Sequence, residues 1–275
     1  MAAAMQQLPL DGQRCLVTGG AGYLGRHLVS ALRGKGCPVH VVDKAPPPES
    51  LDGVRWFQGD VRDHSIVDAA CEGVDTVFHT AAVIDALTHA RRSLARDIES
   101  INVGGTTNVI RAARRRGVRR LIHTSSIVAS FCMESAGSDE TAPYSTSRDL
   151  YTATKVRGEQ AVLRANGKDG LLTCALRPGG IYGPGERFTY GRLVRALKLG
   201  APLVVFGDGR ARLDYVYIDS LVEGQLRAAE RLVEGSPVCG QAYFLSDDTP
   251  INAGQFSIEL AKHMGLQVPL VRVPD

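Results

Sequence analysis

The sequence predicts an α/β fold in which helices cover a doubly wound parallel sheet, followed by a smaller C-terminal lobe. Short runs rich in β-branched and other apolar residues alternate with stretches of helical periodicity along most of the chain. Such alternation is typical of parallel strands joined by crossover helices. The 275 residues are enough for one large domain, or for a core that carries a second lobe.

The order of the expected elements follows from these patterns. Strands are expected at Arg14–Thr18, Val39–Val42, Val54–Gln58, Thr76–His79, Leu121–Ser125 and Leu172–Leu176. The clearest helices are expected at Tyr23–Leu32, Ile101–Arg115 and Leu150–Arg164. Later elements are a strand at Tyr215–Ile218, a helix at Asp219–Leu232, a strand near Tyr243 and a helix at Gln255–Met264.

The pattern changes after Pro178, where glycine and proline concentrate between residues 179 and 185. This concentration indicates the start of a second lobe. The strand and helix between residues 215 and 232 are expected to return to the core. We therefore assign residues 1–178 and about 208–235 to the core, and about 179–207 and 236–275 to an interleaved substrate lobe.

Composition places the chain among ordinary globular proteins. Hydrophobic residues make up 44% of the chain and charged residues 22%, which argues against a disordered or fibrous protein. The formal net charge is +3, and arginines cluster between positions 111 and 120 without interleaved aromatic residues. We expect this cluster to be a solvated helix face and predict no nucleic-acid partner.

Cysteines and apolar runs bear on metal binding and location. The six cysteines form no C-x-x-C pair and have no histidine at metal-binding spacing, so we expect reduced thiols and no metal site. No stretch reaches the roughly 18 apolar residues of a membrane helix, and residues 1–10 do not have the pattern of a signal peptide. These features favour a cytoplasmic protein without a membrane span.

The first expected strand leads into a glycine-rich turn that opens the next helix. Gly19, Gly22 and Gly25 are spaced as G-x-x-G-x-x-G, and Tyr23 and Leu24 lie between the last two glycines. Without side chains, the backbone can turn tightly and approach a pyrophosphate, whose charge is met by amides at the helix N-terminus. The position between a strand and a helix favours a Rossmann-type dinucleotide site over an ordinary glycine turn.

A carboxylate at the end of the second strand predicts which dinucleotide binds. Asp43 follows Gly25 by 18 positions, where a carboxylate can accept hydrogen bonds from the adenosine ribose and repel a 2′-phosphate. NAD is therefore favoured over NADP, and the neighbouring Lys44 keeps NADP as the alternative. Asp60 and Val61 follow the third strand, where they would lie at the adenine edge or form a simple strand-end turn.

Tyr151 and Lys155 form the candidate reactive pair. They are four positions apart, which places both side chains on one face of a helix. A free tyrosine has a pKa of about 10, and a neighbouring ammonium would favour its phenolate form. Thr124-Ser125-Ser126 lies at the carboxyl end of an expected parallel strand, where open α/β sheets bind ligands. Ser126 could hold a substrate oxygen there, and Ser125 is the alternative. Both serines could also serve only to hydrogen-bond backbone groups.

On these residues the chain resembles the extended short-chain dehydrogenase/reductase family, and the resemblance runs from the glycine turn almost to residue 275. The family's markers appear here in order as Gly19-x-x-Gly22-x-x-Gly25, Asp60-Val61, His79-Thr80-Ala81-Ala82, Asn102-Val103-x-Gly105-Thr106, Thr124-Ser125-Ser126, Tyr151-x-x-x-Lys155 and Arg177-Pro178. The resemblance implies that Ser126, Tyr151 and Lys155 are the catalytic triad. Asn102 would hold a proton-relay water. The cofactor would also be lined by Thr80, Ala81, Ala82, Pro178 and Ile181.

The chemistry that the resemblance implies is hydride exchange between a secondary alcohol carbon and a nicotinamide. Tyr151 would take or give the hydroxyl proton, and Ser126 would position the oxygen. Lys155 would tune the tyrosine and also hold the nicotinamide ribose. The implied partner is a small-molecule alcohol.

Within the family, the chain looks most like the 3β-hydroxysteroid dehydrogenases and their sterol-processing relatives, through residues 174–185 and 214–218. Nucleotide-sugar enzymes typically carry an arginine before the aspartate that matches Asp214, because its guanidinium grips a diphosphate. Leu213 stands here instead, which favours a steroid-type alcohol. Because Arg210 and Arg212 are near, a nucleotide-sugar epimerase or dehydratase is the alternative. A non-catalytic NAD(H)-binding sensor or scaffold is the second alternative.

The sequence stops shortly after the last expected helix, at Val271-Arg272-Val273-Pro274-Asp275. The sterol-type relatives continue with further helices, and several continue with an apolar membrane-associating segment. We therefore predict a shortened form whose lobe leaves apolar surface uncovered, which favours self-association into a homodimer. A longer natural form would be placed at the endoplasmic reticulum, and a compact enzyme that ends here is the alternative.

Overall fold

The chain folds into two compact units, each built from two separated stretches of sequence. The computed structural model describes residues 7–48, 52–84, 92–130, 137–188, 190–206, 208, 210–266 and 269–273. The core unit comprises Met1–Arg177 with Val222–Leu245, and the second unit comprises Pro178–Leu221 with Ser246–Asp275. Cys132, Pro274 and Asp275, which the sequence analysis considered, lie outside the described residues.

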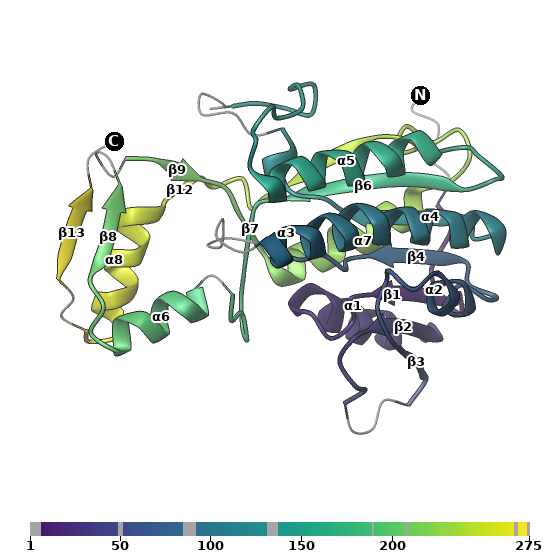
Figure 1. Cartoon of the computed structure of the whole chain (residues 1–275), viewed down its shortest axis with the longest axis horizontal. Helices are drawn as coiled ribbons and strands as arrows, with labels where there is room; N and C mark the ends of the chain where they lie inside the picture. Colours follow the sequence, from purple (N-terminus) through teal and green to yellow (C-terminus); the bar gives the residue numbers. More distant parts are fainter. Residues whose placement is uncertain are drawn as a thin grey trace. The chain divides into compact units, whose positions relative to one another are not determined.

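A seven-stranded sheet forms the centre of the core unit (Figure 1). Its strands, in the order of the sheet, are β11 (Ala242–Leu245), β6 (Leu172–Pro178), β5 (Arg120–Thr124), β4 (Thr76–His79), β1 (Cys15–Thr18), β2 (Val39–Asp43) and β3 (Val54–Gln58). The strands from β1 to β6 pair in parallel, and the strand order reverses between β1 and β4. This arrangement confirms the predicted doubly wound sheet of the Rossmann type.

Helices connect these strands. The core unit contains α1 (Tyr23–Gly34), α2 (His64–Ala70), α3 (Arg92–Glu99), α4 (Thr106–Arg115), α5 (Leu150–Ala165), a 3₁₀ turn η2 (Ile127–Ala129) and most of α7 (Ile218–Arg231). Figure 1 shows α4 beside α5, and α4 also packs against α2. The helix predicted at Ile101–Arg115 is α-helical only from Thr106, because its first residues belong to a π-helix, η1 (Ser100–Gly105). Glycine disfavours a regular helix, and a Cβ on Gly105 would lie 2.6 Å from a Val61 methyl group.

Burial and capping explain why these elements form. All residues of β1 and β4 are buried, as expected for strands covered on both faces. Helix α5 begins at Leu150 because the Asp149 carboxylate accepts a hydrogen bond from the Thr152 amide at 2.8 Å. Each fully buried aliphatic side chain contributes about 1.5–3 kcal/mol. The apolar cluster between sheet and helices includes Leu16, Val77, Val109, Leu121 and Val162.

The second unit is built from short strand pairs and two helices in its described part. The strand pairs are β7 (Gly180–Tyr182) with β10 (Tyr215–Tyr217), β9 (Arg212–Leu213) with β12 (Ile251–Asn252), and β8 (Leu203–Phe206) with β13 (Leu270–Val273). The helices are α6 (Tyr190–Lys198) and α8 (Ala253–His263). Leu197, Leu203 and Ala261 form a small apolar cluster of this unit.

The observed division differs from the expected one at two boundaries. The strand near Tyr243, expected in the lobe, is β11 and extends the core sheet beside β6. Its approach is held by the Gly240 amide, which donates to the Thr173 carbonyl at 2.7 Å. Residues 208–221, expected in the core, belong to the second unit, because the strand at Tyr215–Tyr217 pairs with β7 instead of the core sheet.

Three general features can be stated for the described residues. None of their helices has the combination of length and apolar character that a bilayer crossing requires. Their cysteines are free thiols. No group of three or more described histidine, cysteine, aspartate or glutamate side chains is arranged to hold a metal ion.

Candidate active site

The glycine turn between β1 and α1 is shaped for a ligand that approaches the backbone. Gly19 has a φ of +76°, a conformation that favours glycine. A Cβ on Gly25 would lie 2.0 Å from the Gly19 carbonyl oxygen, so the helix can start this close to the strand only without that side chain. Gly22 caps α1 without a side-chain hydrogen bond, and the first turn of α1 contains no acidic residue. The positive end of α1 is therefore suited to an anion such as a pyrophosphate.

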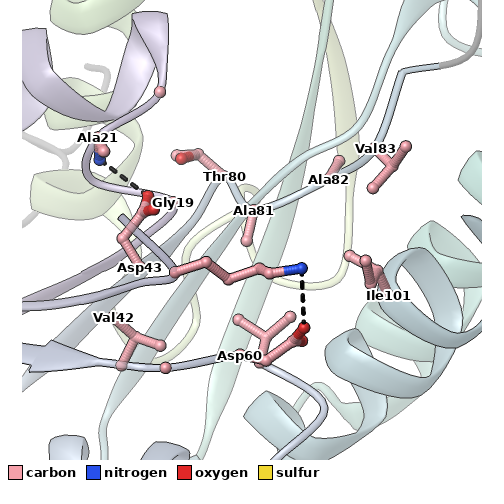
Figure 2. Close-up of a pocket in the computed structure, with 14 residues that line it drawn as sticks. Gly19, Ala21, Val42, Asp43, Asp60, Thr80, Ala81, Ala82, Val83 and Ile101 are labelled. Carbon is pink, nitrogen blue, oxygen red and sulfur yellow. Dashed lines mark hydrogen bonds and ion pairs between the residues drawn. The ribbon is translucent and has the colours of Figure 1, made fainter. Parts of the chain in front are cut away.

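A pocket of about 370 Å³ lies beside this turn (Figure 2). Its lining includes most of the cofactor residues expected from the sequence, namely Gly19, Gly22, Asp43, Asp60, Val61, Thr80, Ala81 and Ala82. The lining also contains residues that were not predicted to bind the cofactor, namely Ala21, Val42, Lys44, Gly59, Val83 and Ile101. Apart from Lys44, which the sequence had indicated as a factor in cofactor choice, these residues are small or apolar, and only the fold shows that they line a pocket.

The other expected cofactor residues do not line this pocket. Tyr23, Leu24 and Gly25 form the first turn of α1, where Leu24 and Gly25 are buried. They therefore support the glycine turn from the side that faces away from the pocket lining. Pro178 is the last residue of β6 and the first residue assigned to the second unit, in which Ile181 lies in β7.

Asp43 connects the end of β2 to the glycine turn. One carboxylate oxygen accepts the Ala21 amide at 2.9 Å (Figure 2), and the other accepts the Ala45 amide at 2.9 Å. Each carboxylate oxygen can accept a further hydrogen bond. Asp43 can therefore hold the turn and still accept the hydroxyl groups of a ribose, so the chain's own residues fit an adenine dinucleotide.

Helix α5 places Tyr151 in its first turn and Lys155 one turn later. The Lys155 Nζ atom lies 5.8 Å from the centroid of the Tyr151 ring. Burial raises the pKa of Tyr151 to about 12, and a hydrogen bond with the Ser126 side chain opposes this rise. Ser126 is the second residue after β5 and caps η2, where its hydroxyl accepts the Val128 amide at 3.4 Å. The structure thus brings together the three side chains expected to form the triad.

Lys155 occupies a buried site with one strong hydrogen-bond acceptor and one nearby carboxylate. It is 5% exposed and donates to the Thr124 carbonyl at 3.0 Å. Burial lowers the pKa of Lys155 to about 8, and the negative charge of Glu159 opposes this shift. Glu159 lies one turn further along α5 and is fully buried, where it accepts hydrogen bonds from Arg177 at 2.6 and 3.0 Å. Sequence reasoning missed Glu159, although its place four residues after Lys155 puts it on the same helix face.

A chain of buried hydrogen bonds links Asn102 to the strand before the glycine turn. The Asn102 side chain donates to the Thr154 hydroxyl of α5 at 3.1 Å, and its backbone carbonyl accepts the Thr106 hydroxyl at 2.7 Å. His79 lies 2.9 Å from that Thr106 hydroxyl through Nε2 and 2.7 Å from the Thr18 hydroxyl through Nδ1. Burial lowers the pKa of His79 to about 3, so the ring is neutral. Because Thr106 donates to Asn102, Nε2 carries the histidine proton.

Known proteins are similar to this chain both in sequence and in structure. The sequence profile of the 3-beta hydroxysteroid dehydrogenase/isomerase family matches residues 16–274. The 3 beta-hydroxysteroid dehydrogenase/Delta 5→4-isomerase of Mycobacterium tuberculosis is 41% identical over 270 residues, which covers 94% of this chain and 72% of that protein. The short-chain dehydrogenase/reductase family 42E member 1 of Bos taurus is 39% identical over 275 residues, which covers 94% of this chain and 69% of that protein.

Solved structures share the fold over almost the whole chain. The UDP-glucose 4-epimerase of Thermus thermophilus, in complex with NAD, superposes with a TM-score of 0.78 at 26% sequence identity. The superposition covers 95% of this chain and 86% of the epimerase.

Proposed function

The chain belongs to the 3-beta hydroxysteroid dehydrogenase/isomerase family, and from this we propose that it oxidises the 3β-hydroxyl group of a steroid or sterol with NAD. At the level of the family it is an oxidoreductase of the short-chain dehydrogenase/reductase type that uses a nicotinamide cofactor. The observation that carries the finer proposal is the assembly of Ser126, Tyr151 and Lys155 at the carboxyl edge of the sheet, where the pocket beside the glycine turn also lies.

Tyr151 is the proposed acid/base residue. In the oxidation direction its phenolate takes the proton of the substrate hydroxyl while the carbinol carbon loses a hydride, for which the nicotinamide is the acceptor when bound. Ser126 is the proposed anchor for the substrate oxygen, because its side chain already lies within hydrogen-bonding reach of the phenol. In the reduction direction the same phenol returns the proton.

Lys155 is proposed to make the phenolate accessible near neutral pH. A phenol with a pKa of about 12 is ionised in only about one molecule in 100,000 at pH 7. The buried ammonium of Lys155 favours the phenolate electrostatically, because little water screens the two groups. Since the Lys155 pKa is about 8, most molecules keep this ammonium at pH 7. Asn102, which is tied to α5 through Thr154, is the proposed holder of a relay water.

The chain's own residues favour an uncharged alcohol over a nucleotide sugar. Leu213, the position where a diphosphate-gripping arginine would stand, is apolar and pairs with Ile251 between β9 and β12. The relative with 41% identity is named a steroid dehydrogenase. A sugar-nucleotide substrate is the second candidate, because a UDP-glucose epimerase shares the fold at 26% identity.

The test is NADH formation by the purified protein, measured by absorbance against a panel of 3β-hydroxysteroids and UDP-sugars. We expect oxidation of at least one steroid. Tyr151→Phe should lower turnover about a hundredfold or more, while NADH binding, measured by fluorescence, stays within about twofold because the ring remains. Redox-neutral conversion of a UDP-sugar without oxidation of any steroid would contradict the proposal, as would a Tyr151→Phe variant that keeps its turnover.

A further inference from the structure

Lys44 is a cation placed where it could affect the choice between NAD and NADP. It directly follows Asp43, and among the residues described in the pocket lining it is the only cation. Its side chain is 66% exposed, and its amine lies 3.5 Å from an oxygen of Asp60. A phosphate on a ribose held by Asp43 would need a cation nearby, and Lys44 is the candidate in this lining.

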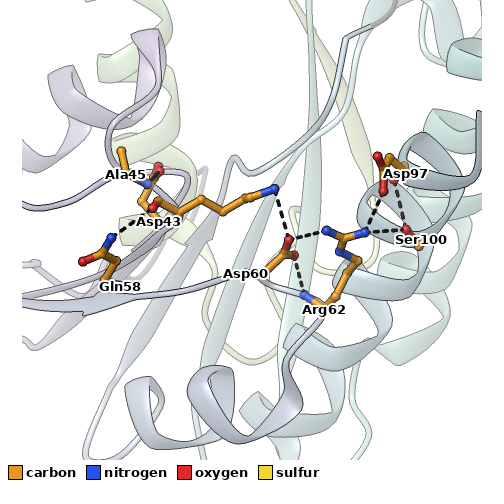
Figure 3. Close-up of polar contacts among 8 residues, drawn as sticks. Asp43, Ala45, Gln58, Asp60, Arg62, Asp97 and Ser100 are labelled. Atoms are coloured by element: carbon orange, nitrogen blue, oxygen red, sulfur yellow. Dashed lines mark hydrogen bonds and ion pairs between the residues drawn. The ribbon is translucent and has the colours of Figure 1, made fainter. Parts of the chain in front are cut away.

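Asp60 is held more firmly than Lys44. The Arg62 guanidinium donates to the Asp60 carboxylate at 2.6 Å, and the Arg62 amide donates to its other oxygen at 2.9 Å. Arg62 is fixed in turn by Asp97 at 2.8 Å and by the Ser100 hydroxyl at 3.3 Å (Figure 3). Partial burial opposes ionisation of Asp60, but the hydrogen bonds from Arg62 outweigh it and lower the Asp60 pKa. Asp60 is therefore a fixed negative charge, whereas the exposed Lys44 side chain is free to follow its partners.

We propose that Asp60 determines cofactor specificity by neutralising Lys44, which removes the cation that a 2′-phosphate would require. The proposal rests on the proposed use of a nicotinamide dinucleotide. A 2′-phosphate carries about −1.5 to −2 charges and would meet Asp43 together with the ion-pair cluster of Lys44, Asp60, Arg62 and Asp97. These three carboxylates and two cations carry a formal net charge of −1. Without the Asp60 charge, Lys44 balances Asp43 and can turn toward the phosphate. Asp43 thus repels the phosphate directly, and Asp60 does so through Lys44.

The test is a double-mutant cycle on the ratio of two dissociation constants, those of NADH and NADPH, measured by fluorescence titration. Asp60→Asn should shift this ratio toward NADPH by about ten- to thirtyfold, the effect of one unit charge on a phosphate of about −1.5 to −2 charges at 4 Å in a water-like medium. Lys44→Ala alone should shift the ratio toward NADH, because it leaves the negative charge of Asp60 without its partner amine. The double variant should return to within about twofold of the wild-type ratio. Any adenine contact of Asp60 is common to both cofactors and cancels in the ratio.

Asp97→Asn is the matched control. It removes an equal charge from the other carboxylate on Arg62, but Asp97 makes no ion pair with Lys44. The ratio should stay within about twofold of wild type in this variant, and the Asp60→Asn shift should shrink as salt is added. Thermal melting of each variant confirms that it is folded.

Three results would overturn the proposal: an unchanged ratio in Asp60→Asn, a shift that survives in the double variant, or an equal shift in Asp97→Asn. If the wild-type protein binds neither cofactor, the proposed function fails and takes this inference with it. If NADH binds normally and the ratio does not move, only the role of Asp60 is wrong.

Discussion

Replacing Glu159 by glutamine should destabilise the core unit strongly, because it removes one charge from a buried ion pair. The Glu159 and Arg177 side chains are 0% and 4% exposed and share hydrogen bonds of 2.6, 3.0 and 3.2 Å. Arg177 also donates to the Ser130 hydroxyl at 3.2 Å. Its guanidinium carbon lies 5.5 and 5.4 Å from the ring centroids of Tyr144 and Phe244.

The size of the expected loss in stability depends on the contacts that Arg177 retains in the variant. Removing one partner of a buried pair costs about 3–5 kcal/mol, because the other charge stays buried without compensation. The glutamine amide retains an acceptor oxygen, and Ser130 and the two rings still contact the guanidinium, so the lower end, about 3 kcal/mol, is expected. A loss of this size lowers the melting temperature by about 6–12 °C in a domain of 150–250 residues.

Calorimetric melting of Glu159→Gln beside Glu99→Gln measures this loss against a matched control. Glu99 also pairs with an arginine of α5, Arg157, at 2.6 Å, but the Glu99 and Arg157 side chains are 42% and 46% exposed. An exposed pair contributes about 0.2–1 kcal/mol, so Glu99→Gln should lower the melting temperature by only a few degrees. Equal losses in the two variants would refute the argument that burial sets the cost.

Other predictions concern the site and the effect of pH. Gly25→Ala should weaken NADH binding more than about tenfold, because the added Cβ would lie 2.0 Å from the Gly19 carbonyl oxygen and displace the turn; unchanged affinity by titration would contradict this. Burial lowers the pKa of His79 to about 3 and that of His123 well below its usual value. The unfolded chain therefore binds more protons than the folded chain below a pH of about 6.5. The free energy of unfolding, measured in urea, should decrease as the pH is lowered from about 6.5, and it should decrease less steeply in His123→Phe. The Lys155 pKa of about 8 should give the pH profile of kcat/KM for alcohol oxidation an upper limb near pH 8, and a profile that keeps rising to pH 10 would rule out a required ammonium.

The strands of the core could be predicted because each one is a short apolar run with a clear end. β3 and β4 have the residues that the sequence predicts, Val54–Gln58 and Thr76–His79. The partners of later strands could not be predicted. β10 and β11 are short, and the sequence of such a short strand does not predict which strand it pairs with. The π-helical turn η1 at the start of the expected helix was also missed. A side chain on Gly105 would meet Val61 there, and these two residues are distant in sequence.

The features of the candidate site likewise fall into local ones, which the sequence predicts, and ones that depend on the fold. The glycine spacing and the Tyr151–Lys155 spacing are local, so the sequence shows them directly. Glu159 reads in the sequence as one more polar residue of a surface helix, and only the fold brings Arg177 of β6 against it. Lys44 could be named from the sequence as a complication for cofactor choice, but its ion pair with Asp60 depends on the packing of β2 beside β3.

The late addition of β11 to the core sheet has a consequence during protein synthesis. The ribosome completes Met1–Arg177 before it reaches β11, and at about 5–20 residues per second the interval lasts several seconds. Throughout this interval β6, with its buried residues Cys174, Ala175 and Leu176, has an unpaired outer edge. Such an edge can pair with another nascent chain on the same messenger RNA. Chaperones that shield extended apolar segments should therefore be needed most while residues 178–245 are being made.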